Sequence, residues 1–397
     1  MGRPNDIHLT PQAADWLADP RVSAVCEAVA SDGAGIYFVG GCVRNALMGR
    51  PVSDVDLSTP SRPEDVTRKC EAAGLRVVPT GVGHGTVTVV SGGQGFEVTT
   101  FRKDVATDGR RATVAFTDDI ADDARRRDFT MNALYATPEG RVIDPLGGLP
   151  DLLAGRVRFI EDAAQRIKED YLRILRFFRF SAWYGDPAAG FEAETLAAIA
   201  AHLDGLAHLS KERIGAEMKK LLEAPDPAPA VAAMERLGVL QAILPGSDAR
   251  FLPILLHMEG EAGITAAPMT RLAALGGEQV ANNLRLSKAE ANTLADVAEA
   301  AQNGQAPAEV AYRKGADVAL QAMLLRAVLT EQPPRPEEKD QIARGASASF
   351  PLSARDLMPE YTGKALGERL QTLEQAWIES GFALGREDLM RLGGRRK

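Results

Sequence analysis

The sequence has few of the residues that build disulfide frameworks or histidine-based metal centres. Its 397 residues include three cysteines and five histidines. The cysteines, Cys26, Cys42 and Cys70, form no CxxC pair and cannot all pair with one another. This pattern argues against a disulfide scaffold and a structural zinc site, and it favours a reducing cytoplasm as the compartment.

Long apolar runs are also missing. No segment approaches the roughly 20 consecutive apolar residues that span a bilayer, and the first residues lack the apolar core of a signal peptide. Hydrophobic residues make up 45% and charged residues 25% of the chain, which is typical of globular proteins. We therefore expect a soluble protein without membrane contact, and a chain of this length predicts more than one domain.

The chain has no overall excess of positive charge. Its net charge is -8, which taken alone disfavours a nucleic-acid partner. Basic residues are nevertheless clustered at 125–127, between 156 and 179, and between 211 and 220. Each cluster could line a positive groove or be a solvated helix face, and the sequence leaves both interpretations open.

Strand patterns concentrate between residues 35 and 145, and helical patterns follow from about 151. Short runs rich in β-branched or aromatic residues predict strands at 36–40, 86–90, 96–101 and 132–137. Helical periodicity dominates the later chain. We expect a small α/β or α+β domain at 1–150, followed by helical segments at 151–245 and 246–397.

The first motif is a double glycine at a strand-to-helix turn, Gly40-Gly41-x-Val43-Arg44. Glycine lets the backbone approach a ligand closely, and the start of a helix favours a phosphate group. Arg44 could add a guanidinium contact to a triphosphate. Neither GxxxxGK[ST] nor GxGxxG follows the first strand, which argues against a P-loop or Rossmann nucleotide-binding protein.

Two aspartates follow about a dozen residues later, Asp54 and Asp56. In a strand, residues two apart face the same side, so their like charges require neutralisation. A pair of Mg²⁺ ions would provide it and would suit phosphoryl transfer. A surface turn is the alternative, which the preceding glycine motif disfavours. Glu97 is a candidate third carboxylate, or equally a partner in a structural ion pair.

Residues 124–134 combine polar groups with an apolar core. Arg126 and Arg127 suit a triphosphate, while Asp128 and Asn132 suit a ribose hydroxyl. A basic helix cap with a satisfied aspartate is the alternative interpretation.

A helix is predicted over residues 166–185, with Glu169, Asp170 and Arg173 on one side of it. Residues three or four apart are neighbours on a helix. A carboxylate beside a guanidinium offers an acceptor and donors, and such a pair can read the edge of a base without a template. An ordinary ion pair within the helix is the alternative.

Taken in this order, the motifs resemble the class II tRNA nucleotidyltransferase and bacterial poly(A) polymerase family. Residues 209–222 are similar to the last helical motif of that family, and the resemblance extends from about 35 to 245. It implies an α+β fold with a polymerase-β-like nucleotidyltransferase head domain, followed by an all-helical neck, body and tail.

The resemblance also implies roles for individual residues. Asp54 and Asp56 would bind Mg²⁺. Glu97, chosen from its position in a strand and not from the resemblance, completes the expected catalytic set. The expected nucleotide-binding residues are Gly40, Gly41, Arg44, Arg126, Arg127, Asp128, Asn132, Glu169, Asp170, Arg173 and Arg176.

The expected reaction is template-independent addition of C, C and A to the 3′ end of tRNA. CTP and ATP would be the substrates, pyrophosphate the product, and no protein partner is evident. A poly(A) polymerase and an inactive RNA-binding relative remain alternatives.

Residues 102–124 would correspond to the flexible loop of the family. Asn45 departs from the usual Val-Arg-Asp motif, and we expect looser local packing there.

Overall fold

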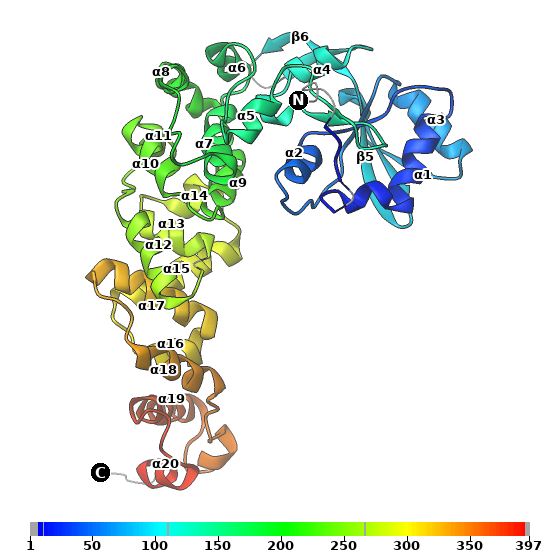
Figure 1. Cartoon of the computed structure of the whole chain (residues 1–397). Helices are drawn as coiled ribbons and strands as arrows, with labels where there is room; N and C mark the ends of the chain where they lie inside the picture. Colours follow the sequence, from blue (N-terminus) through cyan, green and yellow to red (C-terminus); the bar gives the residue numbers. More distant parts are fainter. Residues whose placement is uncertain (1–6, 11, 109–110, 266, 394–397) are drawn as a thin grey trace. The chain divides into compact units, whose positions relative to one another are not determined.

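The computed structural model describes residues 7–10, 12–108, 111–265 and 267–393 (Figure 1). Contacts divide the chain into two compact units, Met1–Ile243 and Leu244–Lys397. Among the described residues, no helix is both long enough and apolar enough to cross a membrane.

The first unit contains a seven-stranded mixed sheet. Its strands, in spatial order, are β3 (Arg76–Gly81), β4 (Thr86–Ser91), β5 (Gln94–Thr100), β2 (Leu57–Thr59), β1 (Tyr37–Val39), β8 (Tyr135–Ala136) and β9 (Val142–Ile143). β2 and β5 pair in parallel, whereas the other described neighbours in this sheet are antiparallel. The strands expected at 36–40, 86–90 and 96–101 are confirmed. The one expected at 132–137 shrinks to β8, because a 3-10 turn occupies Thr130–Asn132.

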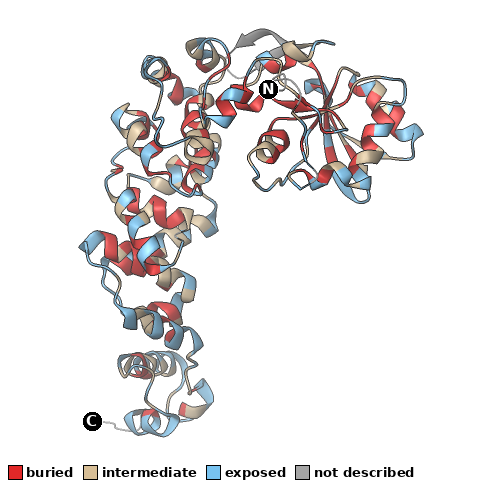
Figure 2. Cartoon of the chain, in the orientation of Figure 1, coloured by how far each residue is buried: buried red, intermediate tan, exposed pale blue. Residues whose placement is uncertain are grey.

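Helices α1 (Pro20–Val29) and α3 (Pro63–Ala72) pack against β4 and β5. Each begins with proline, whose fixed φ suits the first helical turn. Strand β4 alternates buried and half-buried residues, so one of its faces belongs to the core. Figure 2 shows the buried residues gathered on the sheet and on the inner sides of these helices.

A separate hairpin follows the sheet. It consists of β6 (Arg102–Asp108) and β7 (Arg111–Phe116), paired antiparallel. Residues 102–124 were expected to correspond to the flexible loop of the family. The structure places a hairpin in this span, residues 109–110 lie outside the described part, and the correspondence stays a prediction. Helix α4 (Ile120–Arg125) comes next, and the Asp119 side chain caps it by accepting from the Ala121 N–H at 2.8 Å.

The rest of the first unit is helical. Its helices are α5 (Leu149–Leu153), α6 (Ala163–Glu169), α7 (Leu172–Tyr184), α8 (Ala193–Ala200), the 3-10 helix η4 (Leu203–His208), α9 (Lys211–Leu222), α10 (Ala228–Arg236) and α11 (Val239–Ile243). The single helix predicted over 166–185 is wrong in one respect. The backbone is extended at Asp170, with φ -155° and ψ 105°, so α6 ends before α7 begins.

The second unit is helical, as expected for the later chain. Its α-helices are α12 (Phe251–Ala262), α13 (Pro268–Leu275), α14 (Val280–Asn283), α15 (Lys288–Gln302), α16 (Pro307–Lys314), α17 (Ala316–Thr330), α18 (Pro336–Ser347), α19 (Gly363–Glu379) and α20 (Arg386–Gly393). A buried ion pair joins α12 to α13, because Arg271 donates to both carboxylate oxygens of Glu259, at 2.9 and 2.7 Å.

Two glycines of the second unit provide a matched test of its packing. A Cβ at Gly345 would lie 2.0 Å from the Ala308 carbonyl oxygen, where α18 meets α16. Gly345→Ala should therefore destabilise this unit by about 1–3 kcal/mol.

Gly367 lies in α19, and no described atom lies within 4 Å of its added Cβ. Gly367→Ala should therefore stabilise it by about 0.5–1 kcal/mol. Thermal unfolding measures both, and an unchanged melting temperature for Gly345→Ala would contradict the packing.

Candidate active site

A cavity of about 340 Å³ lies within the first unit. It is lined by Gly40, Gly41, Arg44, Asp56, Arg127, Asp128, Asn132, Asp170, Arg173, Arg176 and Phe180. Apart from Phe180, every one of these residues was singled out in the sequence. Segments more than 100 residues apart in the chain thus meet around one space, and Asp54, Glu97, Arg126 and Glu169 are the predicted residues outside its lining.

The double glycine forms one wall of the cavity. Gly40 has φ +71° and ψ -117°, a conformation that residues with a Cβ rarely adopt. An added Cβ there would lie 3.4 Å from Nη1 of Arg127. The turn therefore requires glycine for its backbone conformation, while Arg127 lies at an ordinary contact distance from the position of the added Cβ.

Arg44 is almost fully buried in the wall. Its Nη1 donates to Asn132 Oδ1 at 2.5 Å, and its Nη2 donates to the Tyr184 hydroxyl at 2.8 Å. Burial lowers the pKa of Arg44, and Tyr184 and Asp128 oppose that shift. The guanidinium assigned to a triphosphate in the sequence thus already has several protein partners.

The expected loosening at Asn45 is wrong. Its Oδ1 accepts from Nε and Nη2 of Arg44, at 3.1 and 2.9 Å. Its Nδ2 donates to the Pro51 carbonyl at 2.8 Å. An amide can accept and donate at once, so Asn45 holds Arg44 and also anchors the loop that leads to the aspartates.

Asp54 and Asp56 lie just before β2 rather than inside it. The Val39 N–H donates to the Asp56 carbonyl at 3.0 Å, so the pairing with β1 already begins at Asp56. The parallel register matches Leu57 with Val98. It therefore places Asp56 beside Glu97, and the role of Glu97 as a third catalytic carboxylate stays a prediction.

The carboxylates at this edge affect one another. Removal of water by the surrounding wall raises the pKa of Asp56, the charges of Glu97 and Asp54 also raise it, and Arg127 opposes them. Negative charge is therefore concentrated at this end of the cavity, while Arg127 lies on its border.

Arg127 is held by a partner that the sequence did not single out. Asp123 Oδ2 accepts from Arg127 Nη2 at 3.0 Å and from the Tyr135 hydroxyl at 2.7 Å. Burial alone would raise the pKa of Asp123, but Arg127, Arg126 and the Tyr135 hydroxyl bring it below its ordinary value. The four-residue spacing from Asp123 to Arg127 was the available signal.

Asp128 and Asn132 form a hydrogen-bonded pair in the wall. Asp128 Oδ1 accepts from Asn132 Nδ2 at 2.9 Å and from the Phe129 N–H at 2.8 Å. Its Oδ2 accepts from Nε and Nη2 of Arg176, at 2.7 and 2.5 Å. Burial acts to raise the pKa of Asp128, but Arg176 and the hydrogen bonds lower it overall. The carboxylate is therefore kept ionised.

Arg173 is fixed at the start of α7. Its Nη1 donates to Glu169 Oε2 at 2.6 Å, and its Nη2 donates to the Arg126 carbonyl at 3.1 Å. Glu169 also binds Arg166 at 2.5 Å. The ion pair considered as an alternative is present between Glu169 and Arg173, and Arg173 nevertheless lines the cavity.

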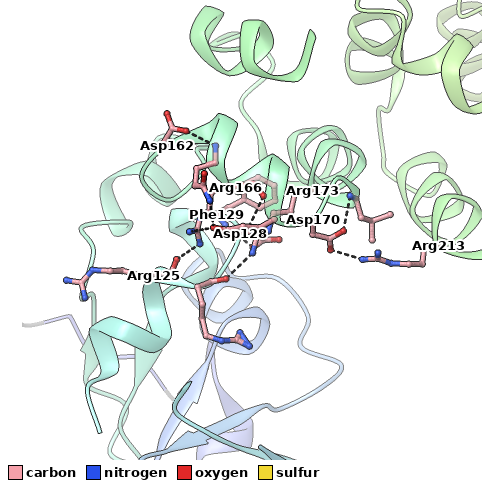
Figure 3. Close-up of polar contacts among 12 residues, drawn as sticks. Arg125, Asp128, Phe129, Asp162, Arg166, Asp170, Arg173 and Arg213 are labelled. Atoms are coloured by element: carbon pink, nitrogen blue, oxygen red, sulfur yellow. Dashed lines mark hydrogen bonds and ion pairs between the residues drawn. The ribbon is translucent and has the colours of Figure 1, made fainter. Parts of the chain in front are cut away.

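Asp170 lies at the break between α6 and α7 and also lines the cavity. Its Oδ1 accepts from the Leu172 N–H at 3.1 Å, and its Oδ2 accepts from Arg213 Nη2 at 2.7 Å. Figure 3 shows Arg213 reaching Asp170 from α9. Arg213 was not among the predicted site residues, although its segment carries the last helical motif.

Two family descriptions match the chain. The family described as "Poly A polymerase head domain" matches residues 36–158. The family described as "Probable RNA and SrmB- binding site of polymerase A" matches residues 190–251. The first span includes the glycine turn, both aspartates and the Arg127 to Asn132 segment.

Relatives of similar length match as well. The mouse (Mus musculus) protein "CCA tRNA nucleotidyltransferase 1, mitochondrial" is 32% identical over 93% of this chain and 88% of its own length. The "CCA-adding enzyme" of Geobacillus stearothermophilus is 34% identical over 86% of this chain and 87% of its own length. The chain belongs to the CCA tRNA nucleotidyltransferase family. A solved structure of the Bacillus stearothermophilus CCA-adding enzyme in complex with CTP matches with a TM-score of 0.73 and 27% identity, over 91% of this chain and 94% of that one.

These matches confirm the family and the fold class predicted from the motifs. An α+β head is followed by helices, as the structure shows. The roles of the individual site residues stay predictions.

The ionised Asp128 carboxylate leads to a test by pH. Asp128→Asn removes the charge that Arg176 binds, so the first unit should lose about 2–3 kcal/mol of stability at neutral pH. Because the pKa of Asp128 is lower in the folded chain than in the unfolded chain, its charged carboxylate stabilises the folded state at pH values above the unfolded pKa, near 3.9. This stabilisation is lost as the pH falls below that value toward the folded-state pKa. The difference in the free energy of unfolding between the wild type and Asp128→Asn should therefore become smaller below about pH 4.

Calorimetric unfolding of the full chain at pH 7 and pH 3.5 measures this gap. Asp118→Asn is the control, because Asp118 is exposed in the loop before α4 and should change little at either pH. An equal gap at both pH values for Asp128→Asn would contradict the account.

Proposed function

We propose that this chain adds C, C and A in turn to the 3′ end of tRNA, using CTP and ATP and releasing pyrophosphate. The observation that carries this proposal is the single cavity in which the glycine turn, Asp56, the Asp128–Asn132 pair and the Asp170–Arg173 pair meet. The named relatives of similar length support it.

The phosphates of the nucleotide would lie at the glycine turn and Arg127. Asp123 and Tyr135 orient Arg127 by hydrogen bonds, and such fixed charges stabilise a charged transition state better than mobile ones. Arg126 approaches Asp123 at 3.9 Å and stays outside the cavity lining, so we assign it a supporting role.

Asp170 and Arg173 would read the base. Cytosine and adenine each present an amino group beside an unprotonated ring nitrogen. A carboxylate accepts from the amino group, and a guanidinium donates to the ring nitrogen. Guanine and uracil present a carbonyl oxygen and a ring N–H at the corresponding positions, so the same pair would reject both. One pair can therefore serve CTP and ATP.

Asp54 and Asp56 are suitable ligands for Mg²⁺, which prefers carboxylate oxygens. Burial raises the pKa of Asp56, the charges of Glu97 and Asp54 raise it further, and a bound divalent cation would oppose these effects. Among the described residues, no group of three or more His, Cys, Asp or Glu side chains is placed to hold a metal ion by itself. Phosphate oxygens and water would complete the coordination, as is usual for Mg²⁺, and Glu97 would add negative charge beside it. When bound, Mg²⁺ supplies Lewis-acid stabilisation of the reacting oxygens.

The chain's own residues would act mainly by positioning. The tRNA 3′ oxygen attacks the α-phosphorus as the bond to the pyrophosphate oxygen breaks, and in-line alignment is what the protein must provide. Base, ribose and phosphate contacts around one cavity would fix the α-phosphate relative to the edge that carries Asp54 and Asp56.

The remaining assignments are proposals of the same kind. Residues 1–150 would hold the nucleotide, and residues 151–245 would contribute to recognition of the base. Both 151–245 and 246–397 would bind RNA through the charge of the RNA backbone and its shape.

The three described cysteines are free and buried, which fits a reducing compartment such as the cytoplasm. Relatives from mouse, zebrafish and human are named as mitochondrial.

The direct test is transfer of labelled CTP and ATP to three tRNA transcripts, lacking CCA, lacking only A, or complete. We expect incorporation of C, C and A on the first, A alone on the second, and nothing on the third. Open-ended addition of A to any RNA would establish a poly(A) polymerase instead, and no incorporation would indicate a non-catalytic binder.

The two aspartates can be tested in the same assay. Asp54→Ala and Asp56→Ala should each reduce transfer at least about 100-fold, because each removes a ligand of the Mg²⁺ that would stabilise the charge on the reacting phosphate. Chelation of divalent cations should have the same effect on the wild type. Asp65→Ala on α3 is the control, since Asp65 forms an exposed pair with Arg68. Variants that keep their melting temperature and substantial activity would contradict the metal-binding assignment.

A further inference from the structure

Tyr184, the last residue of α7, is in contact with a buried arginine of the cavity wall. The Arg44 guanidinium lies 4.0 Å from the centroid of the Tyr184 ring and 5.2 Å from that of Phe180. Its Nη2 also donates to the Tyr184 hydroxyl at 2.8 Å. A cation over aromatic faces is attracted to them, so ring and hydroxyl together fix where Arg44 lies.

Arg44 in turn fixes the orientation of Asn132. A guanidinium only donates hydrogen bonds, so Asn132 must turn its oxygen toward Arg44, as observed at 2.5 Å. On its other side, Asn132 donates through Nδ2 to the ionised Asp128 at 2.9 Å. A carboxylate only accepts, so both neighbours impose the same orientation of the amide.

This orientation determines what the wall offers to a ligand. Asn132 and Asp128 both line the cavity. The amide has a second N–H, for which the described contacts give no acceptor, and it lies beside a carboxylate. A donor next to an acceptor matches a hydroxyl group, which accepts one hydrogen bond and donates another. A flipped Asn132 would present oxygen beside a carboxylate and would lose this match.

Arg44 is poorly suited to grip a phosphate in addition. A guanidinium has five N–H groups, and four hydrogen bonds from Arg44 go to Asn45, Asn132 and Tyr184. Asn45 accepts hydrogen bonds from Nε and Nη2 of Arg44, and the Tyr184 ring packs against the guanidinium. The hydrogen-bonding capacity of Arg44 is therefore used mainly within the cavity wall.

We infer that Tyr184 and Arg44 are positioning residues that hold Asn132 in the orientation that recognises the ribose 2′-hydroxyl, and so make the site selective for ribonucleotides. The inference rests on the proposed function for the identity of the nucleotide. Tyr184 lies on the helix that also carries Arg173 and Arg176. Arg50 secures that end of the helix by donating to the Trp183 carbonyl at 2.5 Å. Helix α7 thus carries residues that would recognise the base and residues that would position the groups recognising the ribose.

Equilibrium binding of CTP, dCTP and ATP to the full-length chain without tRNA tests the inference. The wild type should bind CTP more tightly than dCTP. Tyr184→Phe keeps the ring and loses the hydroxyl, so the preference for CTP over dCTP should fall at least about fivefold, as expected for one hydrogen bond. Tyr184→Leu also loses the ring and should lower the preference further. The ratio of CTP to ATP affinity should stay constant in both, because Asp170 and Arg173 are untouched.

Trp183→Phe is the matched control. Its indole N–H donates to the Lys220 carbonyl at 2.7 Å, so the substitution alters the same helix end without altering the Arg44 contact. The CTP to dCTP ratio of this variant should equal that of the wild type, and melting temperatures show that each variant is folded.

Three results would overturn the inference. One is a wild type that binds CTP and dCTP equally. Another is a CTP to dCTP ratio that does not change in either Tyr184 variant. The third is an equal loss of affinity for CTP, dCTP and ATP, which would place Arg44 at the triphosphate. These binding measurements do not depend on nucleotide transfer to tRNA. A chain that prefers CTP to dCTP but adds nothing to tRNA would therefore contradict the proposed function alone.

Discussion

The Asp128 carboxylate is the group on which the site depends. It accepts hydrogen bonds from Asn132, the Phe129 backbone and Arg176, and these partners keep it charged although it is buried. Through Asn132 it is linked to Arg44 next to the glycine turn, and through Arg176 to helix α7. A buried charge is costly unless it is paired, so this one carboxylate requires the sheet segment and the helices to meet in one arrangement.

The same constraint explains how an acidic chain builds a cavity lined by arginines. The sequence left open whether its basic clusters line a groove or face solvent. In the structure many of them are paired with carboxylates of the first unit. Of the arginines in these clusters that line the cavity, Arg127 binds Asp123 at 3.0 Å, Arg173 binds Glu169 at 2.6 Å, and Arg176 binds Asp128 at 2.5 Å. Pairing keeps these arginines in fixed geometry, which is what recognition of a nucleotide without a template requires.

Most lining residues of the cavity could be predicted from the sequence, because short motifs place glycine, aspartate and arginine at fixed local spacings. Residues that act through tertiary contacts could not. Tyr184 and Arg213 are joined to Arg44 and Asp170 across 140 and 43 residues, and no local pattern encodes such pairs. The break at Asp170 was missed because the apolar periodicity continues through it. Glu97 became interpretable only from the register of β2 against β5.

A cavity that accepts CTP and ATP through one set of base, ribose and phosphate contacts can hold only one of the two nucleotides at a time. Competition binding on the full-length chain tests it most directly, with labelled CTP displaced by increasing ATP and the bound stoichiometry measured in parallel. We expect complete mutual displacement, with one nucleotide bound per chain. Simultaneous binding of CTP and ATP would contradict it.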